Sequence, residues 1–123
     1  MGDLTSLTEL DLSGNDLSGS IPDDLGDLTD LTDLNLSDNE LTGSIPDDLN
    51  SLTNLTELDL SQNEISSTIP EELGDLTNLT ELSLYNNQLT SVEGVERLTN
   101  LRTLSLCNNQ LTSVEVVEQL TNL

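Results

Sequence analysis

The sequence predicts an α/β solenoid, with a parallel β-sheet along one side and short helical or irregular segments along the other. Two observations carry this prediction. The first is a repeat: blocks of the form L-x-x-L-x-L-x-x-N-x-[LI] begin at positions 7, 31, 55, 79 and 101, with offsets of 24, 24, 24 and 22 residues. Self-similarity at such a period is typical of stacked repeat proteins. The second is the alternation of leucines with polar residues inside each block, which is the pattern of a strand with one buried face.

Each block contributes one predicted strand, and successive strands should pair in register. In the block that begins at residue 31, Leu34 and Leu36 alternate with Asp33, Asn35 and Ser37. The leucines should face the core, and the polar residues should face solvent. Two polar columns across the strands follow from this alignment. One column is Glu9, Asp33, Glu57 and Glu81, and the other is Asp11, Asn35, Asp59 and Ser83.

An asparagine follows each predicted strand at one fixed position. The five are Asn15, Asn39, Asn63, Asn87 and Asn109. An asparagine side chain both donates and accepts hydrogen bonds, so at a turn it can satisfy backbone groups that the bend leaves unpaired. Stacked from coil to coil, these residues are expected to form a ladder.

The return segment of each 24-residue block is predicted to contain a short helical turn. In the second block this turn begins near Pro46, where a proline is tolerated because the first turn needs no amide partner. Asp47 and Asp48 follow and suit the positive end of a helical turn. Pro22 and Pro70 occupy the equivalent positions and also precede acidic pairs.

These residues resemble the leucine-rich repeat. The 24-residue blocks, such as LTDLNLSDNELTGSIPDDLNSLTN at 31–54, resemble its plant-specific class, down to the L-[TS]-G-x-I-P step at 17–22 and 41–46. The last two blocks, from Leu79 and Leu101, lack that step and resemble the shorter class of internalin-like bacterial proteins and phosphatase regulatory subunits. The resemblance covers essentially the whole chain. It implies a curved solenoid that binds a partner on its concave sheet.

The sequence shows no linker, so residues 1–123 are expected to form one leucine-rich-repeat domain of about five coils. The chain opens on the tail of one repeat and closes on what would be the first residue of another. Terminal coils of solenoids normally carry polar caps, and neither end has one here. We therefore expect either a fragment of a longer array or ends that are covered by end-to-end self-association.

The charge balance limits the classes of partner. The chain has 24 acidic and 2 basic residues and a formal charge of −22. Nucleic acid is excluded as a partner because phosphate binding needs clustered Lys and Arg, and an anionic membrane surface is disfavoured. The apolar runs are too short for a spanning helix or a secretory leader. Both a cytoplasmic protein and a fragment of a surface protein fit these facts.

Three interpretations of the acidity stay open. It can be a halophilic adaptation, because so much like charge strains a compact state unless salt screens it. It can be a solvated surface that serves a basic partner. A designed or idealised repeat would also explain the missing residue types, since the chain has no His, Phe or Trp.

Catalysis is not predicted. Without His no imidazole can activate Cys107 or a serine, and an open solvated sheet is a poor place to separate the pKa values of paired carboxylates. No cofactor is predicted. No dedicated metal site is predicted either, because the chain lacks a D-x-[DN]-x-[DN]-G loop. The alternative is a calcium ion shared by the carboxylates of adjacent coils.

The solvent-facing columns are the predicted binding face, which we expect to be most negative in its first four coils. Its residues are Glu9, Asp11, Asp33, Asn35, Glu57, Asp59, Glu81 and Ser83, with Tyr85 beside them. Tyr85 is the only aromatic residue, and tyrosine is enriched among interface hot spots. We expect a non-enzymatic module that binds a protein or peptide, with a basic one favoured by the charge. The alternative is a structural repeat segment of a larger cell-surface adhesin or receptor ectodomain.

The charge of −22 predicts that stability depends on salt. Repulsion between exposed carboxylates is screened when the Debye length falls to about 3 Å at molar salt. The midpoint of thermal unfolding, followed by circular dichroism, should therefore rise from low salt to molar KCl. A midpoint that does not rise would contradict the halophilic interpretation.

Overall fold

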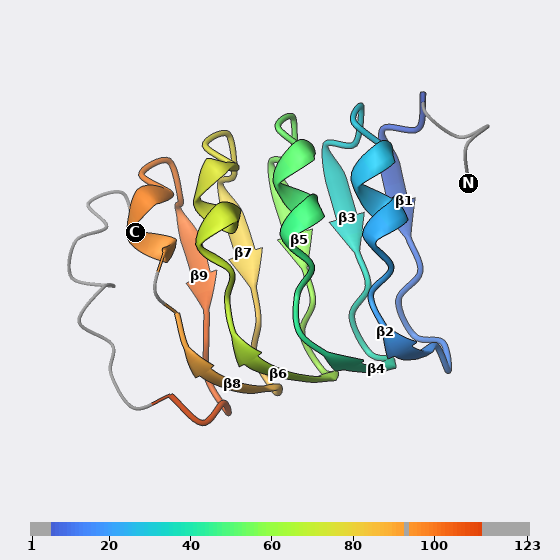
Figure 1. The fold of residues 1–123 in the computed structure, drawn as a ribbon, viewed down its shortest axis with the longest axis vertical. Coiled ribbons are helices and arrows are strands. Elements are labelled where there is room, and N and C mark those ends of the chain that lie inside the picture. Colours follow the sequence, from blue (N-terminus) through green and yellow to red (C-terminus); the bar gives the residue numbers. More distant parts are fainter. Residues whose placement is uncertain (1–5, 93, 112–123) are drawn as a thin grey trace.

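The computed structural model describes residues 6–92 and 94–111 as a stack of coils (Figure 1). One strand from each coil enters a five-stranded parallel sheet in the order β1-β3-β5-β7-β9. The strands are β1 (Glu9–Asp11), β3 (Asp33–Asn35), β5 (Glu57–Asp59), β7 (Glu81–Ser83) and β9 (Thr103–Ser105). The predicted α/β leucine-rich-repeat solenoid is therefore confirmed. The return segment after Leu111 lies outside the described residues.

The predicted register is also confirmed. Glu9 pairs with Asp33, Asp33 with Glu57, and Glu57 with Glu81. The second column runs through Asp11, Asn35, Asp59, Ser83 and Ser105 in the same way. The last pairing of the first column places Glu81 beside Thr103, so this column loses its charge at β9.

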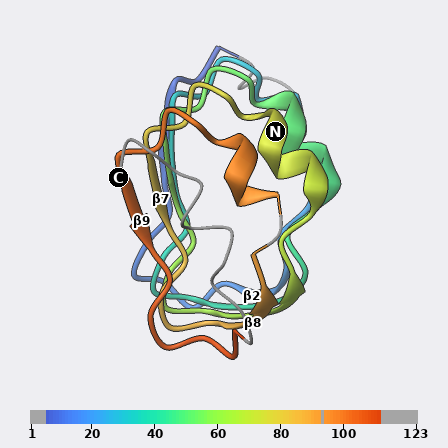
Figure 2. The same ribbon diagram turned by 90° about the vertical axis from the view of Figure 1, so that its left-hand side faces the viewer.

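A second sheet was not predicted by the sequence analysis. It contains β2 (Ser18–Ser20), β4 (Glu40–Gly43), β6 (Glu64–Thr68) and β8 (Gln88–Ser91), also parallel. A view along the stack shows the five-stranded sheet on one side, the helical turns opposite and the second sheet at one end (Figure 2). Gly19 and Gly43 take left-handed backbone angles here, with φ of 79° and 77°. Ser67 has a φ of 74°, and the pairing register shifts just after it.

The helical turns are 3₁₀ helices: η2 (Asp23–Asp27), η3 (Asp47–Ser51), η4 (Glu71–Asp75) and η5 (Val95–Arg97). Each of the first three begins directly after the predicted proline, which is extended and precedes the first turn instead of lying in it. The first turn holds the expected acidic pair. Neighbouring turns pack closely. A Cβ atom on Gly26 would lie 2.5 Å from the Asp48 carbonyl oxygen, so glycine is what lets η2 approach η3.

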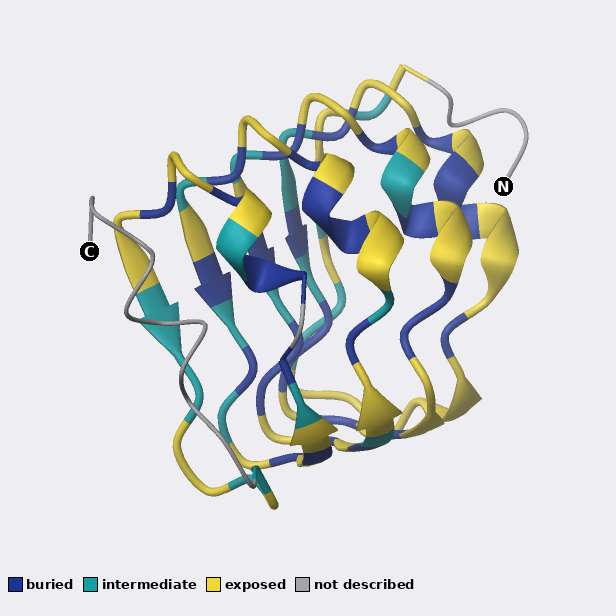
Figure 3. Cartoon of the chain, turned by 60° about the vertical axis from the view of Figure 1, so that its left-hand side comes forward, coloured by how far each residue is buried: buried dark blue, intermediate teal, exposed yellow. Residues whose placement is uncertain are grey.

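Buried leucines and isoleucines from every coil form one continuous core (Figure 3). Leu28, Leu55 and Leu76 are fully buried. Six leucines of the first and last described coils are only partly buried against this core. They are Leu7, Leu10, Leu12, Leu104, Leu106 and Leu111.

The predicted asparagine ladder is present, and it joins each coil to the one before it. The Asn63 side-chain nitrogen donates to the carbonyl oxygens of Leu60 (3.2 Å) and Ser61 (3.1 Å) in its own turn. It also donates to the Leu36 carbonyl oxygen of the preceding coil at 3.0 Å, and its Oδ1 accepts from the Leu41 amide at 3.0 Å. Asn39, Asn87 and Asn109 make the same set of bonds.

Replacing Asn63 by Leu should destabilise the fold by about 1–3 kcal/mol, because the buried Leu41 amide and the carbonyl groups lose their partner. Asn15→Leu is the matched control. Asn15 occupies the same repeat position, but it is exposed and bonds only to Leu12 and Ser13 of its own turn. Urea denaturation should show a clearly larger loss of unfolding free energy for Asn63→Leu. Equal losses would mean that the bonds between coils contribute little.

Candidate binding face

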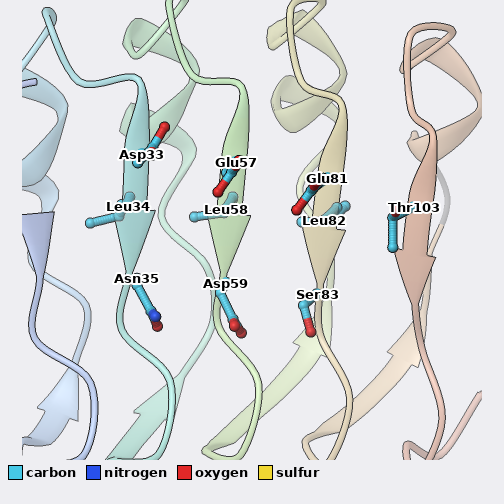
Figure 4. Close-up of a pocket in the computed structure, with 10 residues that line it drawn as sticks. All are labelled: Asp33, Leu34, Asn35, Glu57, Leu58, Asp59, Glu81, Leu82, Ser83 and Thr103. Atoms are coloured by element: carbon cyan, nitrogen blue, oxygen red, sulfur yellow. The ribbon is translucent and has the colours of Figure 1, made fainter. Parts of the chain in front are cut away.

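The outward side chains of the five-stranded sheet form a continuous surface, here called the acidic face. It consists of Glu9, Asp11, Asp33, Asn35, Glu57, Asp59, Glu81 and Ser83. A depression of about 160 Å³ lies on this surface (Figure 4). The structure thus brings eight of the nine predicted binding residues onto one face.

The floor of the depression is closed. Leu34, Leu58 and Leu82 line it but are each only 1% exposed, because they belong to the core. The carboxyl groups of Asp33, Glu57 and Glu81 stand in one row above it, and Thr103 continues this row (Figure 4). This geometry offers a charged surface for contact.

The two columns differ in what their side chains do. The Asp59 Oδ1 atom accepts hydrogen bonds from the Ser61 amide (3.0 Å) and the Ser61 hydroxyl (2.6 Å). Asp11 and Asn35 hold Ser13 and Ser37 in the same way. The hydrogen bonds from Ser13 lower the pKa of Asp11 below its ordinary value, and the hydroxyl group contributes more than the amide. The second column therefore shapes the turn after each strand.

This structural use of the second column was missed by the sequence analysis. Its signal is the [DN]-x-S spacing at 11–13, 35–37 and 59–61. The serines that follow the strands are also less accessible than the sequence suggested, since Ser37 and Ser61 are buried. Cys107, at the same repeat position, is exposed.

Repulsion between like charges is concentrated in the first column of the face. The side chain of Glu57 lies between those of Asp33 and Glu81, its partners on the neighbouring strands. The charges of these two carboxylates raise the pKa of Glu57 above its ordinary value, with a smaller contribution from burial and from Glu9. A cation placed over Glu57 would offset this repulsion.

Tyr85 lies beside the acidic face rather than in it. It is half-buried and does not line the depression. Its hydroxyl group accepts a hydrogen bond from the Gln62 side chain at 3.4 Å, across two neighbouring coils. A separate polar hollow, also missed by the sequence analysis, is lined by Asn78, Thr80, Asn100 and Arg102.

Two further findings concern the described residues. They contain no group of three or more His, Cys, Asp or Glu side chains placed to hold a metal ion. Within residues 6–92 and 94–111, no helix has the length and apolar character needed to cross a bilayer.

Comparison with protein families identifies the chain. A model of paired leucine-rich repeats matches residues 5–51, 29–78 and 53–99, and a model of a single leucine-rich repeat matches residues 100–123. The chain therefore belongs to the leucine-rich-repeat family, whose members are generally interaction modules. The comparison with curated proteins gave no match.

Solved structures show the same fold. A leucine-rich-repeat protein from Leptospira interrogans is 40% identical over 99% of this chain and 31% of its own, with a TM-score of 0.90. An internalin from Listeria monocytogenes is 28% identical over 99% of this chain and 34% of its own, with a TM-score of 0.86. The Arabidopsis receptor kinase HAESA, solved with the peptide hormone IDA and the co-receptor SERK1, is 37% identical over 85% of this chain and 18% of its own, with a TM-score of 0.79. The chain thus spans between 18% and 34% of the length of these structures.

Replacing Glu57 by Gln should stabilise the protein at neutral pH. A carboxyl group whose pKa is raised in the folded state binds its proton more tightly there than in the unfolded chain, so its ionisation costs stability. The gain should shrink as the pH falls through the raised pKa, and it should vanish below the ordinary glutamate value of about 4.3.

Urea denaturation of parent and variant across this pH range measures the effect. Glu40→Gln is the matched control, because Glu40 is exposed on β4, away from the acidic face. It should give a smaller gain at neutral pH. A gain that persists in acid, or that Glu40→Gln reproduces, would show that repulsion within the column is not its cause.

Proposed function

We propose that this chain is a non-enzymatic protein–protein interaction module that binds a basic peptide or protein segment on its acidic face. The observation that supports this most strongly is the row of Asp33, Glu57 and Glu81, which pair in register on adjacent strands. Like charges across neighbouring strands are unfavourable. A basic partner would replace this repulsion by attraction, and it would be steered to the face by the long-range field.

The spacing of the strands suits such a partner. Adjacent strands of a sheet lie about 4.8 Å apart, so the row from Asp33 to Glu81 extends about 10 Å. Lysine and arginine side chains on a short segment can reach several of these carboxylates at once. The closed leucine floor beneath them favours a partner that lies on the surface over one that enters a cavity.

The comparisons support recognition of this kind only by analogy. HAESA was solved with a peptide hormone and a co-receptor, and it shares 37% identity over the matched region. That structure is much longer than this chain, so its partners are not carried over. The analogy supports the use of a leucine-rich-repeat surface for a peptide or protein partner.

A second candidate is a structural repeat segment of a larger cell-surface adhesin or receptor ectodomain. It is favoured by one observation: this chain matches only 18–34% of the length of the three structures described above. In that role the acidic face would be a solvated surface. Binding of a basic probe would then depend only on the net charge of the protein, and not on whether the charged residues lie on the acidic face.

Charge reversal on the face separates the two candidates. Glu57→Lys combined with Glu81→Lys reverses the row while leaving Asp59, which holds Ser61, unchanged. The matched control is Glu40→Lys with Glu64→Lys, which makes the same change in net charge at exposed positions of the second sheet. The probe is a fluorescent peptide of alternating lysine and serine, followed by fluorescence anisotropy at low salt.

The face variant should weaken binding of this peptide by about tenfold or more, since the local field is reversed where the peptide lies. The control pair should weaken it by a much smaller factor. Circular dichroism establishes that both variants are folded. Equal weakening by the two pairs would contradict a binding site on the acidic face and favour the second candidate.

A further inference from the structure

The polar hollow beside the acidic face interrupts the repeat pattern. Its volume is about 520 Å³, and it is lined by Asn78, Thr80, Asn100 and Arg102, which come from neighbouring coils. Arg102 directly precedes Thr103, the residue that continues the row of the first column past Glu81 (Figure 4). The hollow therefore lies beside the end of the row where the carboxylates stop.

Arg102 takes the place of a threonine that recurs in the four preceding blocks. The equivalent residues are Thr8, Thr32, Thr56 and Thr80. The hydroxyl groups of Thr32, Thr56 and Thr80 each donate to the carbonyl oxygen of the threonine one coil before, at 3.1 to 3.2 Å. The Arg102 guanidinium group makes no hydrogen bond or ion pair with another described residue. A threonine is thus sufficient for stacking at this position, and the arginine adds donors to the hollow.

The two asparagines of the hollow supply further donors. The Asn78 Nδ2 atom donates to the Thr53 carbonyl oxygen at 2.9 Å, and the Asn100 Nδ2 atom donates to that of Thr77 at 2.7 Å. Each of these nitrogen atoms carries two hydrogens, so one N–H of each amide has no partner in the described part of the chain. A guanidinium group flanked by amide donors suits a carboxylate, which accepts a bidentate pair of hydrogen bonds.

The charge of the chain decides which carboxylate can reach this hollow. With a formal charge of −22, the protein repels small free anions through its long-range field. A carboxylate that belongs to a basic segment is different, because the acidic face attracts the lysines of that segment. Once they are bound, the carboxylate is held near Arg102 at a high effective concentration. An acidic side chain of the segment on the acidic face is therefore the ligand that the hollow fits.

The spacing of the strands fixes where this acidic side chain lies in the segment. Adjacent strands are about 4.8 Å apart, so the coils of Asp33 and Arg102 are separated by about 14 Å. In an extended segment, side chains two residues apart point the same way and are separated by about 6.8 Å. Two lysines and one acidic residue at alternate positions therefore span the same distance. The lysines would lie over the row from Asp33 to Glu81, and the acidic residue over Arg102.

From these observations we propose that Arg102 determines the specificity of the acidic face by binding an acidic side chain of the segment that lies there. The inference rests on the proposed function and narrows the charge pattern of the partner. The segment carries basic residues at alternate positions, followed two positions further on by an acidic residue. Arg102 and the asparagines of the hollow hold its carboxylate. The same arginine repels a lysine at this end, so a uniformly basic segment is not the preferred partner.

Two matched peptides test the proposal. The probes are fluorescent peptides with blocked termini, S-K-S-K-S-E-S and S-K-S-K-S-Q-S, followed by fluorescence anisotropy at low salt. The variant is Arg102→Thr, which restores the residue that the other coils carry at this position and should leave the fold intact. Thr42→Asp is the matched control, because it makes the same change in net charge at an exposed position of β4. Circular dichroism checks that both variants are folded.

The parent and Thr42→Asp should bind the glutamate peptide about threefold or more tightly than the glutamine peptide, because the carboxylate pairs with Arg102. The net charge of the protein alone predicts the reverse order, since the glutamate peptide is the less positive of the two. Arg102→Thr should lose the preference for the glutamate peptide. It should also bind the glutamine peptide at least as tightly as the parent does, because a cation near the lysines has been removed.

A parent that binds both peptides equally, or the glutamine peptide more tightly, would overturn this inference. A preference that persists in Arg102→Thr would overturn it as well. The variant with Glu57→Lys and Glu81→Lys separates this failure from failure of the proposed function. If that variant weakens binding of both peptides while the glutamate peptide has no advantage on the parent, the acidic face remains the binding site and only the role of Arg102 is wrong. Absence of binding by both peptides would overturn both proposals.

Discussion

The hydrogen bonds of the asparagine ladder are the interaction on which the rest of the structure depends. Leucines alone would gather into a core without fixing how one coil sits on the next. Each internal asparagine bonds to backbone groups of the preceding coil, and so fixes both the spacing and the register of neighbouring coils. These residues are Asn39, Asn63, Asn87 and Asn109. The in-register columns of the acidic face follow from that alignment. The turns leave both backbone amides and backbone carbonyl oxygens without hydrogen-bond partners. The ladder position therefore needs a side chain that carries both a donor group and an acceptor, as asparagine does.

The two outward columns show how one surface can combine stability with recognition. The aspartates and the asparagine of the second column each turn one oxygen toward the following serine and so close the turn. The first column makes no comparable local bond, and its central member, Glu57, lies between like charges. Substitutions at the two columns therefore have different physical meanings. A loss of binding after a change at Asp59 would be ambiguous, whereas one after a change at Glu57 would concern the surface itself.

The sequence was sufficient for the fold because the repeat is read from many copies of one pattern. The spacing of the repeated residues predicted the strands of the five-stranded sheet, their register and the asparagine ladder. It also predicted the helical turns after Pro22, Pro46 and Pro70. The second sheet could not be predicted, because β2 has no apolar residue and β4, β6 and β8 have one each, so none of these strands has an apolar alternation of its own. These strands form because the neighbouring coils hold the backbone in place. The structural role of Asp59 was missed for a related reason: an outward carboxylate looks the same in sequence whether it faces solvent or bonds to the next turn.

The direction of the ladder bears on how such a chain can lengthen over generations. Each asparagine side chain bonds to backbone groups of the preceding coil. A block that is copied in tandem therefore carries the side chain that satisfies the backbone groups of the block before it. Duplication within the gene thus yields a longer array without compensating changes elsewhere, and loss of a whole block leaves the remaining coils with a compatible surface. The shortened period of the last two blocks shows that the surrounding segments can vary while this one position does not. Variation in length and in surface residues is therefore tolerated as long as the asparagine is inherited with each copy.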